Sequence, residues 1–70
     1  MRYAVVIEKG PVSCGAYVPD LPGCVAAGKT VAEVKRLIRG AIRFHLEGLR
    51  REGVPAPKPS TLCEYVEAET

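Results

Sequence analysis

The sequence predicts an α+β domain with the element order β-β-β-α-β, in which one long helix packs on an antiparallel meander of strands. Three observations carry this prediction. Short β-rich stretches separated by glycine and proline fill residues 2–28. A helical periodicity of apolar residues runs from residue 30 to about residue 52. A stiff proline-rich connector at residues 54–60 then leads into a weakly alternating stretch at residues 62–67, which predicts a fourth strand returning to the sheet.

The first three strands are expected at residues 2–8, 12–18 and 23–28. Residues 2–8 are rich in β-branched and aromatic types, and the turn signal K-G-P follows them. The short connection favours a hairpin, and in the second strand Cys14, Ala16 and Val18 share one face. The third strand consists of small residues, which would allow a helix or a second subunit to approach closely.

A rigid turn is predicted between the second and third strands, where the sequence reads Y-V-P-D-L-P-G-C. Pro19 and Pro22 fix φ and remove backbone donors, and Gly23 can adopt a positive φ without steric cost. Shortly afterwards Thr30 and Glu33 form the T-x-x-E pattern of a capping box, which predicts the start of the helix. A strand, a stiff turn and a helix start therefore follow one another closely.

The predicted helix has an apolar face and an opposite basic face, at about 100° per residue. The apolar face comprises Val34, Leu37, Ile38, Ala41, His45 and Leu49, flanked by Val31, Ile42 and Gly48. The basic face comprises Arg36, Arg39, Arg43 and Arg50, with Glu47 near them. Gly53 suits the end of the helix, and Pro55 prevents its continuation.

The composition indicates one small globular domain. A chain of 70 residues has a marginal core, so self-association is expected. It contains no apolar run long enough to span a bilayer, and its N-terminus does not resemble a secretory signal. The absence of Asn and Gln is a weak thermophile signal.

The three cysteines, Cys14, Cys24 and Cys63, are expected to be free thiols in a reducing cytoplasm. Their odd number and the absence of a C-x-x-C pair argue against a disulfide framework. A zinc set of these three thiolates with His45 is permitted in principle but lacks the usual paired spacing. We therefore expect no metal and no cofactor.

No catalytic constellation is evident in the sequence. His45 has apolar neighbours one helical turn away on either side, which favours a structural role. The carboxylates form no convincing pair, since Asp20 stands alone in a turn and Glu64 and Glu67 fall on opposite faces of a strand. The basic helix face could meet nucleic acid phosphates. The net charge is only +2, however, and the pattern lacks aromatic residues interleaved with the basic ones, so a solvated face is favoured.

Several stretches resemble the N-terminal domain of the HicB family of antitoxins. They read Y-A-V-V-I-E, A-Y-V-P-D-L-P-G-C-V-A-A-G-K-T-V-A-E-V, A-I-R-F-H-L-E-G-L and G-V-P-A-P-K-P-S, and they cover most of residues 3–60. The resemblance implies a partial ribonuclease-H-like fold without that fold's catalytic carboxylates. It also implies a non-enzymatic protein that binds and neutralises HicA, a small toxin that cleaves messenger RNA, and that forms dimers or tetramers.

Many members of that family carry a C-terminal DNA-binding domain, and because this sequence ends at Thr70 we expect a single domain without one. The hypothesis is therefore an antitoxin domain that covers the active site of a small basic toxin. The expected partner-binding residues are Pro19, Asp20, Leu21, Pro22, Glu64 and Glu67. The acidic end of the chain also complements the basic helix face and could pair with it between copies.

Three alternatives stay open. The first is a nucleic-acid-binding module that uses Arg36, Arg39, Arg43 and Arg50. The second is a metal-dependent nuclease that depends on Asp20 or His45. The third is a solitary structural oligomer without a toxin.

Overall fold

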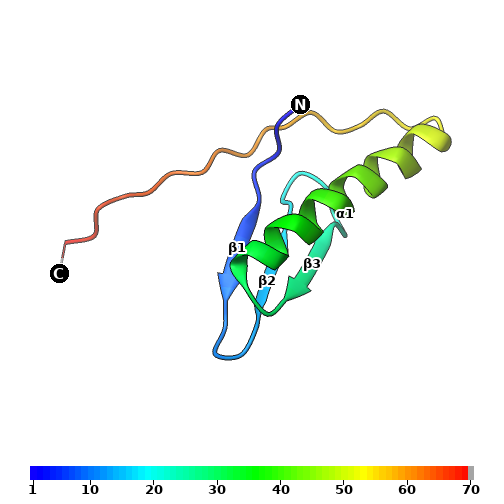
Figure 1. The fold of residues 1–70 in the computed structure, drawn as a ribbon. Coiled ribbons are helices and arrows are strands. Elements are labelled where there is room, and N and C mark those ends of the chain that lie inside the picture. The colour runs from blue at the N-terminus through cyan, green and yellow to red at the C-terminus, as the bar shows by residue number, and fades with distance from the viewer. Residues whose placement is uncertain (70) are drawn as a thin grey trace.

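Three short strands and one long helix make up the computed structural model, which describes residues 1–69. The strands are β1 (Val6–Lys9), β2 (Cys14–Tyr17) and β3 (Val25–Gly28), and the helix is α1 (Val31–Arg51). The strands form one antiparallel sheet in the order β1-β2-β3, and α1 lies across one face of it (Figure 1). The predicted α+β class and the antiparallel meander are confirmed.

Each strand has four residues and is shorter than expected. The ladder between β1 and β2 starts at the pair Lys9 and Cys14, because the turn before it occupies residues 10–13 and is closed by the Gly10 N–H donating to the Ser13 carbonyl. Likewise, β3 starts only after the turn that contains Pro22 and Gly23. The turns therefore take residues that the alternation pattern had assigned to strands.

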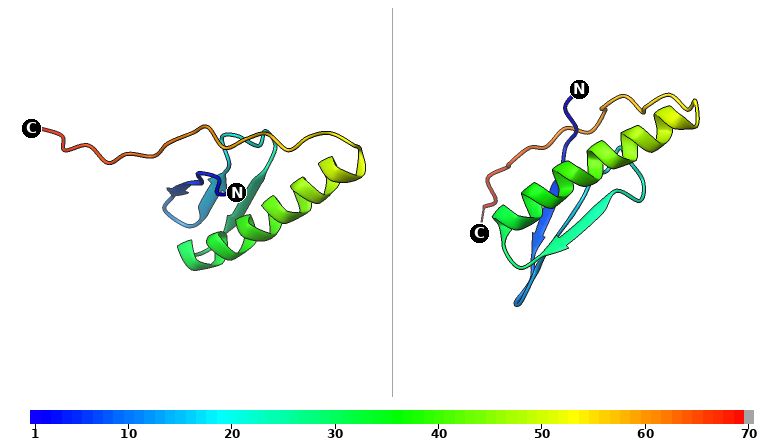
Figure 2. Two further views of the ribbon diagram at one scale, coloured as in Figure 1. Left: turned by 90° about the horizontal axis from the view of Figure 1, so that it is seen from above. Right: turned by 45° about the vertical axis from the view of Figure 1, so that its right-hand side comes forward.

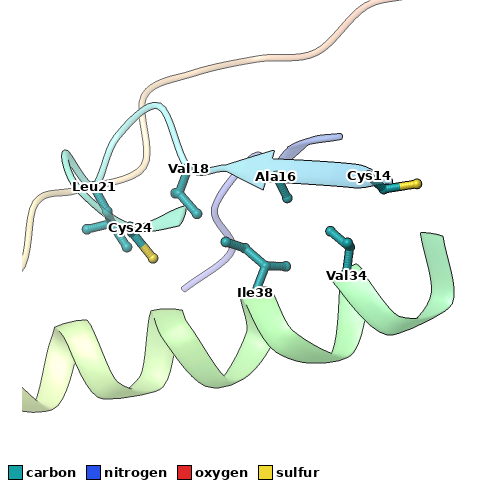
Figure 3. Close-up of a cluster of buried hydrophobic side chains, with 7 residues drawn as sticks. All are labelled: Cys14, Ala16, Val18, Leu21, Cys24, Val34 and Ile38. Atoms are coloured by element: carbon teal, nitrogen blue, oxygen red, sulfur yellow. The ribbon is translucent and has the colours of Figure 1, made fainter. Parts of the chain in front are cut away.

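The core lies between the sheet and α1. Cys14, Ala16 and Val18, on one face of the second strand and its continuation, form one cluster with Val34 and Ile38 of the helix (Figure 3). The face predicted for these three residues is therefore correct. Leu21 and Cys24, from the loop between β2 and β3, close one end of the core. Every one of these seven residues is less than a tenth exposed.

The buried face of α1 differs in detail from the predicted one. Val34 and Ile38 are buried, and the residues that pack against this core from the helix are Val31, Ala41, Ile42 and Leu46. Leu37, which was expected on the core face, is more than a third exposed, so that assignment was wrong. The buried stripe is centred on Val34 and Ile38, and at about 100° per residue Leu37 lies at its margin. The second half of α1 extends beyond the sheet (Figure 1).

The start of α1 confirms the capping prediction with one modification. The Thr30 hydroxyl accepts a hydrogen bond from the Glu33 N–H at 3.1 Å. The Glu33 carboxylate reaches back to the N–H of Lys29, at 2.7 Å, one residue earlier than in the standard capping box. A Cβ at Gly28 would lie 2.6 Å from the Glu33 carboxylate oxygen, so a larger residue there would displace this side chain and its hydrogen bond to Lys29.

The helix ends just before Gly53, as predicted, and the termination is a Schellman motif. Gly53 has φ of 72°, and its N–H donates to the Arg50 carbonyl at 3.1 Å. The next N–H, of Val54, donates to the Leu49 carbonyl at 2.9 Å. These two bonds satisfy carbonyls that the last helical turn leaves free and turn the chain back toward the sheet.

The fourth strand expected at residues 62–67 is not formed. After α1 the chain returns as an extended connector past the N-terminal segment, where the Tyr3 hydroxyl donates to the Pro57 carbonyl. Residues 62–69, which we call the tail, then project away from the sheet (Figures 1 and 2). An extended segment becomes a strand only beside another strand, and within residues 1–69 the tail has none.

Candidate functional site

The loop between β2 and β3 consists of two successive turns, each with proline at its second position. The Leu21 N–H donates to the Val18 carbonyl across Pro19, and the Cys24 N–H donates to the Leu21 carbonyl across Pro22, both at 3.0 Å. Gly23 has φ of 84° at the third position of the second turn, as a type II turn requires. These turns place Leu21 in the core and leave Asp20 at the surface.

Asp20 holds the base of the tail through four hydrogen bonds. One carboxylate oxygen accepts from the N–H groups of Ser60 and Thr61, at 2.9 and 3.0 Å. The other accepts from the two hydroxyl groups, at 3.0 Å from Ser60 and 2.8 Å from Thr61. We call this arrangement the Asp20 clamp, and it joins two segments 40 residues apart in the sequence.

The clamp favours the charged form of its carboxylate. Hydrogen bonds from the backbone N–H groups of Ser60 and Thr61, with help from the two hydroxyls, lower the pKa of Asp20 from 3.8 to about 2. Both carboxylate oxygens are engaged, which leaves this group poorly placed to bind a catalytic metal. The clamp therefore acts as a structural anchor that fixes where the tail leaves the domain.

The tail combines exposed apolar side chains with acidic ones. Leu62, Tyr65 and Val66 are at least 85% exposed, whereas ordinary surface positions of a small domain are mostly polar. Glu64 and Glu67 are exposed as well, and no lysine or arginine occurs after Lys58. The tail is thus an apolar and acidic arm without contacts to the domain beyond its base.

A trough lies between β1 and α1, on the side of the sheet that the helix covers least. Its volume is about 470 Å³, and it is lined by Val5, Ile7, Lys35, Ile38, Arg39 and Ile42. The helix packs mainly on β3 and β2, so this strip of apolar side chains stays accessible beside the edge strand. Lys35 and Arg39 are exposed and flank it with positive charge.

The outer face of α1 carries the predicted basic residues and an unexpected aromatic one. Arg36, Arg39 and Arg43 are exposed, and Arg50 forms an ion pair with Glu47 at 2.7 Å. Phe44 is 81% exposed, in a shallow depression that it shares with Arg43 and Arg51. The sequence interpretation overlooked Phe44, although the helical period already placed it one turn after Gly40, away from the core.

The residues predicted to bind a partner occupy two separate places. Pro19 and Pro22 are exposed on the loop, beside the partly exposed Asp20, whereas Leu21 is fully buried and offers no side-chain surface. Glu64 and Glu67 lie on the tail. The clamp connects the two places, a contact that no local sequence signal could have indicated.

The cysteines and histidine do not form a metal site among residues 1–69. Cys14 and Cys24 are buried, Cys63 is exposed, and all three are free thiols. Burial raises the pKa of the Cys24 thiol, which keeps it in the neutral form. Across the described residues, no three side chains of His, Cys, Asp or Glu gather closely enough to hold an ion.

Comparison with known proteins decides the family. The family described as HicB-like antitoxin of bacterial toxin–antitoxin systems matches residues 3–70. The chain belongs to this family. A chain from a solved structure of a HicA3 and HicB3 toxin–antitoxin complex has the same fold, with a TM-score of 0.70 and 36% sequence identity. That match covers 84% of this HicB-like chain and 69% of the other.

Three curated relatives are similar over most of this HicB-like chain. A 14.9 kDa protein of Haemophilus phage HP1, from the rep–hol intergenic region, is 36% identical over 66 residues, and the chain spans 50% of that protein's length. A UPF0150 protein of Thermoplasma acidophilum is 39% identical over 83% of the chain and 86% of its own length. A UPF0150 protein of Helicobacter pylori is 40% identical over 74% of the chain and 72% of its own length. Within residues 1–69, no helix combines the length and the apolar character needed to cross a membrane.

Proposed function

We propose that this HicB-like domain is an antitoxin that binds a small HicA-type toxin and covers its RNA-cleaving site, without catalysing a reaction itself. The observation that carries the proposal is the structural match to a chain of a toxin–antitoxin complex, which extends over 84% of the residues. The exposed loop at Pro19 and Pro22 and the acidic tail supply surface for a basic partner. The mechanism is steric, because a bound domain prevents RNA from reaching the toxin.

The direct test is to titrate the purified protein into a HicA-type toxin from the same genome while following cleavage of messenger RNA. The expected result is complete inhibition at a fixed molar ratio, together with a stable complex in size-exclusion chromatography. A toxin that binds the domain but still cleaves RNA at saturation would contradict the steric mechanism. Absence of binding would contradict the partner itself.

The contribution of the acidic tail is tested by matched charge removal. Glu64→Gln with Glu67→Gln should weaken the complex and reduce its salt dependence, because charges at an interface accelerate association with an oppositely charged partner. Glu8→Gln with Glu52→Gln removes the same charge from exposed positions outside the tail and should leave affinity unchanged. Equal effects of the two double variants would assign the change to net charge and remove the tail from the interface.

A second function, binding of single-stranded nucleic acid, is favoured by one specific observation. Phe44 lies exposed beside Arg43 and Arg51, and an aromatic ring among cations can stack on a base. Binding through this face would fall steeply with salt and would be lost on Phe44→Ala, while Tyr65→Ala, which removes a ring that is even more exposed, would have no effect. Fluorescence anisotropy with labelled RNA at low salt tests whether the protein binds, and absence of binding at low salt eliminates this function.

A further inference from the structure

The edge strand β1 and the trough beside it form a surface that lacks a partner in the single chain. In the described sheet β1 pairs with β2 on one side only, so its other edge presents free backbone N–H and C=O groups. Beside this edge the trough is lined by Val5, Ile7 and Ile42, which are partly exposed, and by the buried Ile38. An open edge next to an apolar strip is suited to an added strand whose side chains fill that strip.

The tail has the composition that such a surface requires. Leu62, Glu64 and Val66 would share one face of an extended strand. Two aliphatic side chains then match the aliphatic lining of the trough, and the carboxylate between them matches Lys35 and Arg39 at its rim. In the single chain Leu62 is 89% exposed and Val66 is 85% exposed, so this face is unused.

We propose that two copies of this chain exchange their tails, so that residues 62–67 of each copy add to the β1 edge of the other and its Leu62–Val66 face fills the other's trough. The occupant is a second copy because both halves of the contact, the acidic apolar arm and the basic apolar trough, occur on the same chain. The Asp20 clamp fixes the start of the tail on the loop side, and from there the tail projects outward (Figures 1 and 2). The exchange is reciprocal, so it closes as a two-fold dimer and leaves neither a tail nor a β1 edge free.

The opposite face of the added strand would stay available. Cys63, Tyr65 and Glu67 alternate with the residues that enter the trough. A tail bound to a second copy could therefore still present Glu67 to a toxin. The exchange itself does not depend on the toxin, and it is tested with this protein alone.

The test is analytical ultracentrifugation of the full chain over a range of concentrations. The wild-type protein should form a reversible dimer. Leu62→Asp with Val66→Asp should raise the dissociation constant by at least about a hundredfold, since it replaces two buried aliphatic side chains by charges. The variant should keep its circular dichroism spectrum, because neither side chain contacts its own domain in the single chain.

The matched control is on the opposite edge of the sheet. Val25 of β3 is 63% exposed, so Val25→Asp introduces the same kind of charge away from the trough. The dimer should persist in this variant. A dimer that is lost on Val25→Asp but kept on the tail substitutions would overturn the proposal in favour of the β3 edge.

Mixing distinguishes reciprocal exchange from every other mode of dimerisation. Lys35→Glu with Arg39→Glu reverses the charge of the trough and should weaken the dimer, and adding Glu64→Lys to it should restore part of the affinity. The trough variant has an intact tail and the tail variant has an intact trough, so a mixture of the two should form a heterodimer through one remaining contact. A wild-type monomer at all accessible concentrations, or variants that fail to pair on mixing while each alone still dimerises, would overturn the proposal.

Discussion

The domain body and the tail use apolar residues in opposite ways. In the body, which comprises the three strands, the loop between β2 and β3 and α1, Leu21 and Val34 are completely buried in the core, and their burial stabilises the fold. In the tail, the same residue types at Leu62 and Val66 are almost completely exposed. Since such side chains contribute nothing to the stability of a single chain, their presence on an arm anchored by the Asp20 clamp points to contacts made with other molecules.

The largest expected difference is in the free energy of unfolding, between substitutions of Leu21 in the core and of Leu62 in the tail. Leu21→Ala should reduce the free energy of unfolding by about 2–5 kcal/mol, because it opens a cavity in a small core. Leu62→Ala should change it by less than about 0.5 kcal/mol, as is usual for exposed positions. Urea unfolding, measured at a concentration where the protein is monomeric, checks both values. A similar loss in both variants would mean that the tail packs on its own domain in solution.

A smaller effect on the free energy of unfolding is expected when two glycines in different backbone conformations are replaced by alanine. Gly23→Ala should destabilise the protein by about 1–2 kcal/mol, because an alanine is strained at a φ of 84°. Gly40→Ala should stabilise it by up to about 1 kcal/mol, because position 40 lies in the helix with open space around it. Thermal unfolding of the two variants decides. A neutral Gly23→Ala would contradict the type II turn that places Leu21 in the core.

The smallest effect concerns the clamp and depends on pH. The pKa of Asp20 is about 2 when the carboxylate is clamped and 3.8 when it is free, so the folded state binds its proton less tightly. The clamp's contribution is therefore complete above about pH 4 and is lost as the pH falls through about 2. Asp20 is the chain's single aspartate, so its carboxyl carbon can be followed by NMR without ambiguity.

The substitution Asp20→Asn tests the clamp at neutral pH, because it replaces one of the two carboxylate oxygens that accept hydrogen bonds. The amide protons of Ser60 and Thr61 should then exchange faster with solvent, while those of the core strands stay unchanged. An ordinary pKa near 3.8 for Asp20 in the wild-type protein would show that the clamp does not form in solution.

Local chemistry made most of the body predictable from the sequence. The capping pair Thr30 and Glu33, the glycine at 53 and the prolines of the turn each act on backbone groups a few residues away, so their consequences could be derived in order. The exposed Leu37 could not be derived in this way, because helical periodicity gives a broad apolar face and does not specify which part of that face the sheet covers.

The tail was only partly predictable for the same reason. Alternation at residues 62–67 predicted a strand that is not formed, because a strand needs a neighbour and the pattern does not specify one. The clamp joins Asp20 to residues 40 positions away, and side chains at such a separation leave no local signal. The sequence therefore predicted partner-binding residues in two fragments, the loop and the acidic end, and the clamp joins the loop to the base of the tail at Ser60 and Thr61.

Hydrogen–deuterium exchange of residues 62–67 in the full chain, at low and high protein concentration, tests most directly whether the tail becomes ordered only against a second chain. We predict fast exchange in the dilute monomer and protection of these residues in the concentrated dimer, with the exchange of β2 and β3 unchanged. Protection that is already complete in the dilute monomer would mean that the tail pairs with its own sheet. Fast exchange at every concentration would mean that no second copy receives it, and either result would contradict the account.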